Sequence, residues 1–300
     1  MVFDIGGSST KWSIIDEVGE FNESGKFSCP NTAEEFFSEL IKITNEMKVK
    51  YDVKGIAISA PGAVDGETGL IGGVTAIPYI HGPNFKEILK EGTGLNAELE
   101  NDANCAAIAE QWLGNAQGIE NYIVVVLGTA VGCGIIINGK VYQGAHGAAG
   151  EIGWSMQGPL DYTHDLEDDS WNFTSGVILG LYNRYYQATG QKISDARLIL
   201  DLVRQGDVLA TKVVDQYYED VAKGLLNLIC VFDPEVLLLG GGISANQEFL
   251  DKLTDRIEKI KRHHRSMNQL KNDTIADIKP CFLRNDAGLI GAVYQAKQMK

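Results

Sequence analysis

The amino-acid sequence predicts an α/β protein built from two similar halves that flank a cleft. Strand patterns alternate with helical patterns along the chain, which is typical of sheets covered by helices. A strand, a glycine turn and a second strand open the chain at residues 2–16, and the same unit recurs at residues 122–144. One copy in each half favours duplicated domains. We expect an N-terminal α/β domain over residues 1–115 and 287–300, and a larger C-terminal α/β domain over residues 116–286.

The composition is that of a globular protein. The chain has 300 residues, of which 44% are hydrophobic and 22% charged, so it can bury a sizeable core. A net charge of −14 argues against nucleic acid or an anionic membrane as the main partner, and solubility is its simplest explanation. No stretch approaches about 20 apolar residues, and the N-terminus has no signal-peptide pattern, so we expect a cytoplasmic protein. The five cysteines include no Cys-x-x-Cys pair, which argues against a disulfide framework and against zinc.

Local signals define the elements of the first half. An amphipathic helix is predicted over residues 31–47, with a capping box formed by Thr32 and Glu35. Residues 54–65 predict a buried strand that ends in a Pro-Gly turn. The polar cluster Asn-Asp-Ala-Asn at residues 101–104 then precedes an alanine-rich helix over Ala103–Leu113. A helix N-cap explains one of its three polar side chains but not all of them.

The second half follows the same plan. An Asn-Gly pair after the repeated unit predicts a tight hairpin turn with positive φ. An acidic loop over residues 161–169 precedes a mostly helical region that runs to about Val231. Residues 234–244 predict a strand that breaks into three glycines and a helix start. Residues 286–298 predict a closing helix whose small residues allow close packing.

The first glycine turn has the composition of a phosphate-binding loop. Glycines let the backbone approach an oxyanion, and hydroxyls and a lysine add donors. Asp4 precedes the turn and is useful near phosphate only if Mg²⁺ lies between them. The alternative is a plain hairpin in which Asp4 is a turn residue. The candidate nucleotide-binding residues of this loop are Gly6, Gly7, Ser8, Thr10 and Lys11.

Two further glycine clusters extend this interpretation. The second loop contributes Gly128, Thr129 and Gly132, although a buried hairpin also needs glycines. Two such loops, one in each half, would hold a triphosphate from both sides of the cleft. The third cluster, at residues 240–242, either enters a helix or offers a flat backbone surface to a purine base.

Taken together, the motifs resemble the ROK family of sugar kinases, within the actin-like ATPase superfamily. The matching blocks are DIGGSSTK, SAPGAVDGETG, LENDANCAAIAE, LGTAVGCGIIINGKVYQGAHGAAGEIG, LLLGGGIS and DAGLIGA, in the family's order and along nearly the whole chain. The resemblance implies two ribonuclease H-like domains, ATP with Mg²⁺, and a hexose or hexoside phosphorylated on its 6-hydroxyl. It also implies a homodimer.

The resemblance assigns roles to the sugar-site residues. Asp102 matches the general base that takes the proton of the sugar hydroxyl, and Asn101 would hold neighbouring hydroxyls. Asn104 is expected to be structural. Glu151 matches a glutamate that binds sugar, and Gly62 lies in a loop whose backbone faces it.

The same comparison assigns the nucleotide and metal sites. Asp4 matches the aspartate linked to Mg²⁺, through water. The first two glycine loops would bind the phosphates. The third cluster would bind adenosine, through Gly240, Gly241 and Gly242.

Two departures from the family pattern bear on the substrate. Trp154 stands where the family usually has a histidine that binds sugar and helps to hold zinc, and the cysteine-rich zinc block is missing. We therefore expect no zinc, and a loop held by packing of Trp154 and Trp171. The Trp154 ring could stack on a sugar or be a core residue. Ala130 replaces a typical glycine and would be strained if it needed positive φ.

Several alternatives stay open at this stage. Zinc-free members of this kind include kinases of β-glucosides and of other sugars, so the substrate could be glucose, N-acetylmannosamine, another hexose or a β-linked disaccharide. ADP or polyphosphate could replace ATP as the donor. A sugar-sensing transcriptional regulator would need a DNA-binding segment before Phe3, which already lies in the first strand. A sugar-binding protein without catalysis is disfavoured by the presence of Asp4 and Asp102. His146 and the basic run at residues 259–265 are expected to be ordinary surface groups.

Overall fold

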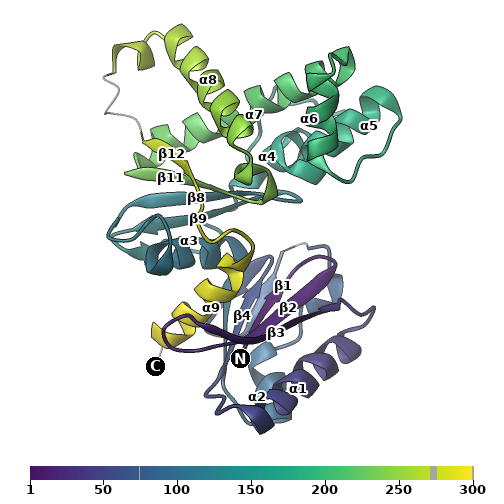
Figure 1. The fold of residues 1–300 in the computed structure, drawn as a ribbon, viewed down its shortest axis with the longest axis vertical. Coiled ribbons are helices and arrows are strands. Elements are labelled where there is room, and N and C mark those ends of the chain that lie inside the picture. Colours follow the sequence, from purple (N-terminus) through teal and green to yellow (C-terminus); the bar gives the residue numbers. More distant parts are fainter. Residues whose placement is uncertain (74, 271–275, 299–300) are drawn as a thin grey trace. The chain divides into compact units, whose positions relative to one another are not determined.

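The computed structural model of the protein describes residues 1–73, 75–270 and 276–298. The chain forms two compact units, drawn in Figure 1. Unit 1 contains Met1–Gly118, Gln143–Ala148 and Asn285–Lys300, and unit 2 contains Ile119–Tyr142 and Ala149–Arg284. Each unit has one five-stranded sheet with helices packed on it.

The sheet of unit 1 has the strand order β3-β2-β1-β4-β7. Its strands are β1 (Val2–Ile5), β2 (Ser9–Ile15), β3 (Phe21–Ser28), β4 (Ile56–Ala60) and β7 (Ala97–Asn101). Its helices are α1 (Ala33–Lys50), α2 (Phe85–Thr93), α3 (Asp102–Leu113) and α9 (Ala287–Gln298). A small hairpin, β5 (Ala63–Asp65) with β6 (Leu70–Gly72), and the short helix η1 (Pro78–Ile80) were not predicted.

The sheet of unit 2 has the order β10-β9-β8-β11-β12. Its strands are β8 (Tyr122–Leu127), β9 (Val131–Ile137), β10 (Lys140–Val141), β11 (Val236–Gly240) and β12 (Asp277–Pro280). Its longer helices are α4 (Trp171–Ser175), η4 (Val177–Tyr182, a π-helix), α5 (Asn183–Thr189), α6 (Ala196–Arg204), α7 (Val208–Phe232) and α8 (Gln247–His263). Short 3₁₀ turns are η2 (Ile152–Trp154), η3 (Leu166–Asp169), η5 (Gly242–Ala245) and η6 (Met267–Gln269); η8 (Arg284–Asp286) leads into α9.

The two sheets have the same topology, which confirms the predicted α/β class and the repeat. In each, the first strand pairs antiparallel with the second and parallel with the fourth, and the fifth strand adds parallel to the fourth. The edge strand β12 was not predicted, because its four residues, Asp-Ile-Lys-Pro, carry a weak strand signal and are largely exposed.

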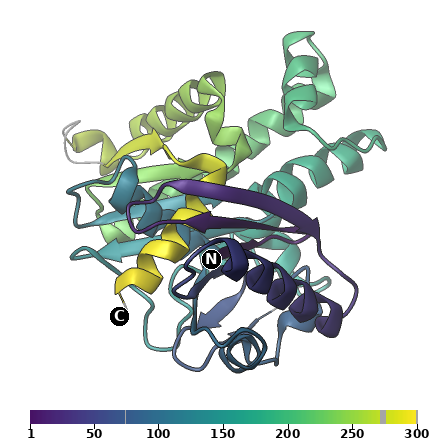
Figure 2. The same ribbon diagram turned by 60° about the horizontal axis from the view of Figure 1, so that its bottom comes forward.

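Different helices cover the two faces of the unit 1 sheet (Figure 2). Phe3 and Ile58 point toward α1 and α2, where they pack with aromatic residues such as Phe36. Val2 and Ala57 point to the other face, where they meet α3 and α9. Since side chains alternate along a strand, Asp4, two residues after Val2, also points to the α3–α9 face.

The closing helix packs closely against α3, as its small residues predicted. A Cβ atom on Gly291 would lie 1.9 Å from the carbonyl oxygen of Cys105, so glycine is required at this crossing. The predicted N-cap at Thr32 and the predicted turn at Asn138 are also confirmed. Thr32 Oγ1 accepts a hydrogen bond from the Glu35 N–H at 3.3 Å, and Asn138 has a φ of +53° in the β9–β10 turn.

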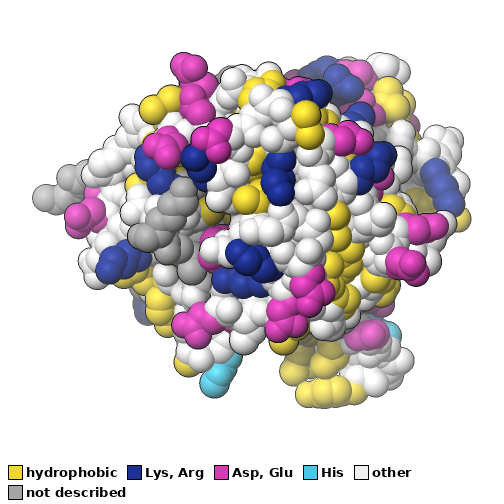
Figure 3. Space-filling view, turned by 90° about the horizontal axis from the view of Figure 1, so that it is seen from below, with side chains coloured by type: hydrophobic (Ala, Val, Ile, Leu, Met, Phe, Trp, Pro, Cys, Tyr) yellow, Lys and Arg dark blue, Asp and Glu magenta, His cyan; other side chains and the backbone are white. Residues whose placement is uncertain are grey.

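Acidic and basic side chains are interspersed on the face drawn in Figure 3 and do not form a patch of one sign. Among the described residues, no helix combines the length and the apolar character needed to cross a bilayer.

Candidate functional site

The predicted site residues of unit 1 lie at one edge of its sheet. β1, β4 and β7 run parallel, and their carboxyl ends lead into the Gly6-Gly7 turn, the Pro61-Gly62 turn and the start of α3. Ligands of open α/β sheets bind at such carboxyl edges. The structure therefore brings together three segments that are distant in the sequence.

Asn101 is the N-cap of α3. Its Oδ1 accepts hydrogen bonds from the backbone N–H groups of Ala103 at 2.9 Å and Asn104 at 3.1 Å. Its Nδ2 donates to the carbonyl oxygen of Gly62 at 3.0 Å, which ties the Pro61-Gly62 turn to the helix start. Both acceptor positions of Oδ1 are thus used by the fold, and the second hydrogen of Nδ2 is the one that could reach a sugar hydroxyl.

Asp102 is the first residue of α3 and is exposed. The helix N-terminus carries partial positive charge, which favours a carboxylate at this position. Asn104, one turn further, is buried and donates from Nδ2 to Glu100 Oε1 at 2.9 Å, in the supporting role expected of it. The three polar residues thus have different roles. Asn101 caps the helix, Asp102 is exposed, and Asn104 supports the strand end from the interior.

Asp4 lies on β1 with little of its side chain exposed. Its Oδ1 accepts a hydrogen bond from Ser59 Oγ at 2.8 Å, and Lys11 Nζ lies 3.8 Å from its Oδ2. Burial raises the pKa of the Asp4 carboxyl, while Ser59 and Lys11 oppose the shift. Lys11 Nζ also donates to the Asn285 carbonyl oxygen at 2.8 Å. A Cβ on Gly288 would lie 2.5 Å from Asp4 Oδ1, so α9 approaches this carboxylate closely.

The surroundings of Asp4 are compatible with a magnesium ion. No cluster of three or more His, Cys, Asp or Glu side chains in the described part of the chain could hold a metal by itself. Mg²⁺, however, is commonly bound by one or two carboxylates, with waters and substrate phosphates completing its shell. The charge of Asp286 also acts on Asp4 and raises its pKa, so a cation would be stabilised here.

Replacing Asp4 with Asn tests this assignment. We expect the Mg²⁺ concentration for half-maximal activity to rise about tenfold or more, because a hard cation loses a charged oxygen ligand. Titrating activity with Mg²⁺ at saturating nucleotide measures the change. An unaltered Mg²⁺ requirement in the Asp4→Asn variant would exclude the role.

The first glycine loop is a hairpin whose tip is exposed. Gly6, Gly7 and Ser8 are exposed, and the Gly6 N–H donates to the Ser9 carbonyl oxygen at 3.1 Å. Thr10 differs from the others, because it is fully buried with its hydroxyl 3.7 Å from Cys29 Sγ. The Thr10 side chain therefore lies in the interior beneath the loop and, unlike Gly6, Gly7 and Ser8, is not exposed to a ligand.

The second glycine loop joins β8 and β9 in unit 2 through residues 128–130. The carbonyl oxygens of Gly128 and Thr129 accept hydrogen bonds from Val177 N at 2.7 Å and Leu179 N at 3.1 Å, which fixes the loop against η4. Gly132 lies within β9, opposite Val126, as a strand residue. Ala130 is not among the described residues with positive φ, so the strain considered from the sequence does not arise.

The third glycine cluster lies beside the second loop. Gly240 ends the buried strand β11, and Gly241 turns the chain with a φ of +89°. A Cβ on Gly241 would lie 2.0 Å from the carbonyl oxygen of Leu127, one residue before Gly128. Only glycine allows this approach. The exposed Gly242 then begins the short helix η5, so the predicted helix start is one 3₁₀ turn ahead of α8.

Glu151 and Trp154 lie at the two ends of the short 3₁₀ helix η2. Glu151 caps η2, and its carbonyl oxygen accepts from Trp154 N at 3.1 Å. Burial raises the pKa of the Glu151 carboxyl. A Cβ on Gly150 would lie 2.2 Å from the Cys133 carbonyl oxygen, so the turn packs tightly on β9. Glu151 has a non-helical backbone conformation, and Trp154, three residues later, is the last residue of the helix.

The two tryptophans of this region have different roles. Trp171 is fully buried and donates from Nε1 to the Asp220 carbonyl oxygen at 3.2 Å. Trp154 is 53% exposed. The expectation that both rings hold the loop by packing is therefore wrong for Trp154, and so is its interpretation as a core residue.

The sequence did not reveal two polar groups behind the site. Ser59 and Glu100 are both buried, and strand register places Asp4 opposite Ser59 and Ser59 opposite Glu100. In the sequence, the only indication of either group is a polar residue inside a short buried strand.

His81 has a structural role, since its ring contacts Thr75 Oγ1 and the Ile71 carbonyl oxygen.

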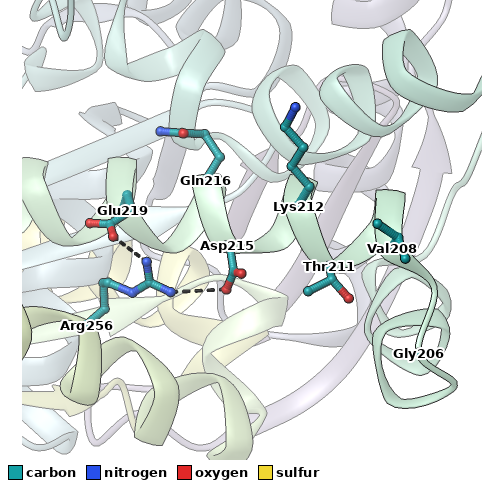
Figure 4. Close-up of a pocket in the computed structure, with 8 residues that line it drawn as sticks. All are labelled: Gly206, Val208, Thr211, Lys212, Asp215, Gln216, Glu219 and Arg256. Carbon is teal, nitrogen blue, oxygen red and sulfur yellow. Dashed lines mark hydrogen bonds and ion pairs between the residues drawn. The ribbon is translucent and has the colours of Figure 1, made fainter.

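A cavity of about 550 Å³ lies elsewhere in unit 2, on α7 and α8 (Figure 4). Arg256 reaches into it and pairs with Asp215 at 3.1 Å and with Glu219. With Lys212, the cavity is lined by two positive and two negative side chains, and none of the predicted site residues line it.

Comparison with known proteins gives a consistent result. The ROK family profile matches residues 1–166 and 172–299. The chain is 34% identical to a beta-glucoside kinase of Listeria innocua over 308 residues, covering 99% of this chain and 96% of that one. It resembles the structure of a ROK family protein from Streptococcus pneumoniae in complex with sucrose, with a TM-score of 0.86, 30% identity and coverage of 100% and 99%. It also resembles a ROK family glucokinase from Streptomyces griseus in complex with glucose and AMPPNP, with a TM-score of 0.80, 27% identity and coverage of 99% and 98%.

Proposed function

The chain belongs to the ROK family, and from this premise we propose that it is an ATP-dependent kinase acting on the 6-hydroxyl of a hexose or hexoside. The observation that carries the proposal is the exposed carboxylate of Asp102 at the N-terminus of α3, beside the N-cap residue Asn101 and the Gly62 turn. A carboxylate in this position can meet a substrate hydroxyl without disturbing the fold behind it.

Asp102 is proposed as the general base. A sugar hydroxyl has a high pKa and is a poor nucleophile, so a carboxylate within hydrogen-bond reach orients it and accepts its proton. The hydroxyl oxygen forms a bond to the γ-phosphorus while the bond from that phosphorus to the bridging oxygen of ADP breaks. Phosphoryl transfer of this kind depends mainly on positioning and electrostatic stabilisation.

The glycine loops are proposed to bind the nucleotide. In unit 1 the exposed Gly6, Gly7 and Ser8 offer backbone and hydroxyl donors to phosphate oxygens, and Lys11 lies beside Asp4. In unit 2 the contiguous loops that contain Gly128 and Gly241 offer a second backbone surface. A Mg²⁺ ion held at Asp4 would neutralise charge on the phosphates.

We propose a β-glucoside as the substrate, with Glu151 on the hydroxyls of the glucosyl ring. Trp154 ends η2 three residues after Glu151 and exposes its ring, so a second ring bound beside the first could stack on it. The name of the Listeria innocua relative and the sucrose in the Streptococcus pneumoniae structure are consistent with a substrate of two linked units.

A panel of sugars tests the proposal directly. ADP release is measured with ATP and Mg²⁺ in the presence of glucose, N-acetylmannosamine, another hexose or cellobiose. With ADP or polyphosphate as the alternative donor, formation of the sugar phosphate is measured instead. We expect turnover to be highest with cellobiose, and phosphorus–carbon coupling in the product to show phosphate on oxygen 6. Absence of sugar-stimulated ATP consumption across the panel would refute the kinase assignment.

The Trp154→Ala variant tests the contact with the second ring. We expect kcat/KM for cellobiose to fall about 5- to 10-fold while kcat/KM for glucose stays within twofold, since an aromatic contact contributes about 0.5–1.5 kcal/mol. Trp154→Phe should retain most of the selectivity. Tyr162→Ala, at an 80% exposed position on the same segment, is the control. An equal loss for both sugars would contradict the proposed selectivity.

A further inference from the structure

We propose that Glu100, a buried carboxylate behind the site, is a positioning residue that fixes the direction of Asp102. This inference rests on the function proposed above, because it concerns the geometry of the proposed base. Glu100 is the residue before the N-cap of α3 and is 3% exposed, so it does not itself reach the surface.

Three donors converge on the Glu100 carboxylate. Oε1 accepts hydrogen bonds from the Asn101 N–H at 2.8 Å and from Asn104 Nδ2 at 2.9 Å, and Oε2 accepts from Gln143 Nε2 at 3.4 Å. Every one of these partners is a donor, so the arrangement suits an acceptor-only ionised carboxylate. Without it, buried donors would lose their partner, which is costly.

Two of these contacts involve residues on either side of Asp102 in the sequence. Asn101 precedes Asp102, and Asn104 follows it by two residues on the first turn of α3. Glu100 therefore holds the backbone on one side of the base and a side chain on the other. Asn101 in turn caps the helix and binds the Gly62 carbonyl oxygen, so the same network fixes the turn proposed to face the sugar.

The third donor comes from a remote part of the chain. Gln143 belongs to the short segment Gln143–Ala148, which lies in unit 1 although the residues on both sides of it belong to unit 2. Its contact with Glu100 joins that segment to the start of α3. The network therefore combines a strand end, a helix start and an isolated segment.

Burying the charged form of Glu100 has a cost in folding free energy. Burial raises the pKa of its carboxyl, while the hydrogen bonds from Asn104, Asn101 and Gln143 oppose the shift. Burying a charge does not favour stability by itself, and a well-packed apolar side chain of similar volume would often cost less. A role in fixing the geometry of the site explains why a carboxylate suits this position.

The experiment compares Glu100→Ala and Glu100→Gln with a matched control. Glu110 is also a buried glutamate and lies near the other end of α3, where it accepts a hydrogen bond from Asn115 N at 2.8 Å. For each full-length variant, kcat and the KM values for sugar and ATP are measured, and unfolding by denaturant gives the folded fraction. We expect kcat of Glu100→Ala to fall about 10- to 100-fold per folded molecule, because small displacements of a reacting group are costly.

The conservative substitution separates positioning from mere structure. Glu100→Gln keeps an oxygen for two of the donors, so we expect a smaller loss of about 3- to 10-fold in kcat with KM for ATP within twofold. Glu110→Gln should change kcat by less than twofold. The proposal is overturned if Glu110→Gln loses kcat to the same degree as Glu100→Gln. It is also overturned if Glu100→Gln retains the full kcat, and this result is decisive even if Glu100→Ala does not fold.

The Asp102→Asn variant, assayed in parallel, distinguishes this failure from that of the proposed function. If Asp102→Asn is inactive and both Glu100 variants are fully active, the positioning role is wrong and the kinase mechanism stands. If Asp102→Asn is active, the proposed base is wrong whatever Glu100 does.

Discussion

Replacing Asp102 with Asn is expected to lower kcat by about 10²- to 10⁴-fold, with little change in KM for the sugar. The substitution keeps the size of the side chain and its exposed place on the first turn of α3. It removes the group that accepts the proton of the hydroxyl, a contribution made mainly in the transition state, and such a loss affects kcat more than KM. Initial rates of ADP release over a range of sugar concentrations measure both constants.

The chain offers a matched control for this experiment. Glu87 lies in the first turn of α2, where Asn84 is the N-cap, so it also is a carboxylate at a helix N-terminus of unit 1. Glu87→Gln should leave kcat within about twofold of the parent protein, because no proposed substrate contact involves it. Turnover of Asp102→Asn at a rate near that of Glu87→Gln would show that the proton goes elsewhere.

Replacing Trp171 with Ala is expected to destabilise unit 2 by about 3–5 kcal/mol. The ring is fully buried, and its Nε1 bonds to the Asp220 carbonyl oxygen at 3.2 Å. It packs so closely on α7 that a Cβ on Gly224 would lie 2.1 Å from it. Truncation therefore leaves a cavity and a carbonyl oxygen without this partner, and the surrounding helices can close the space only in part.

The measurement is denaturant unfolding followed by circular dichroism, which does not depend on tryptophan fluorescence. Trp154→Ala is the matched control, because the same residue type at a 53% exposed position should change the free energy of unfolding by about 0.5 kcal/mol or less. A similar stability for the two variants would contradict the assignment of Trp171 as the ring that holds this region.

The sequence by itself determined the features that depend on neighbouring residues. The two strand–turn–strand units, the cap at Thr32 and the positive φ of Asn138 are set within a few residues, and all three are present. The order of the motifs was also sufficient to predict the ROK family, which the comparison confirms.

Tertiary structure decided which polar side chains support the site and which reach its surface. Thr10 and Glu100 are both buried, and each has a partner from a distant part of the sequence: Cys29 lies beside Thr10, and Gln143 donates to Glu100. Likewise, nothing near Trp154 in the sequence distinguishes it from Trp171, yet one ring is exposed and the other buried. Burial depends on residues that the fold brings together. A local sequence pattern can therefore identify candidate site residues, but it cannot distinguish the exposed ones from the buried ones that support them.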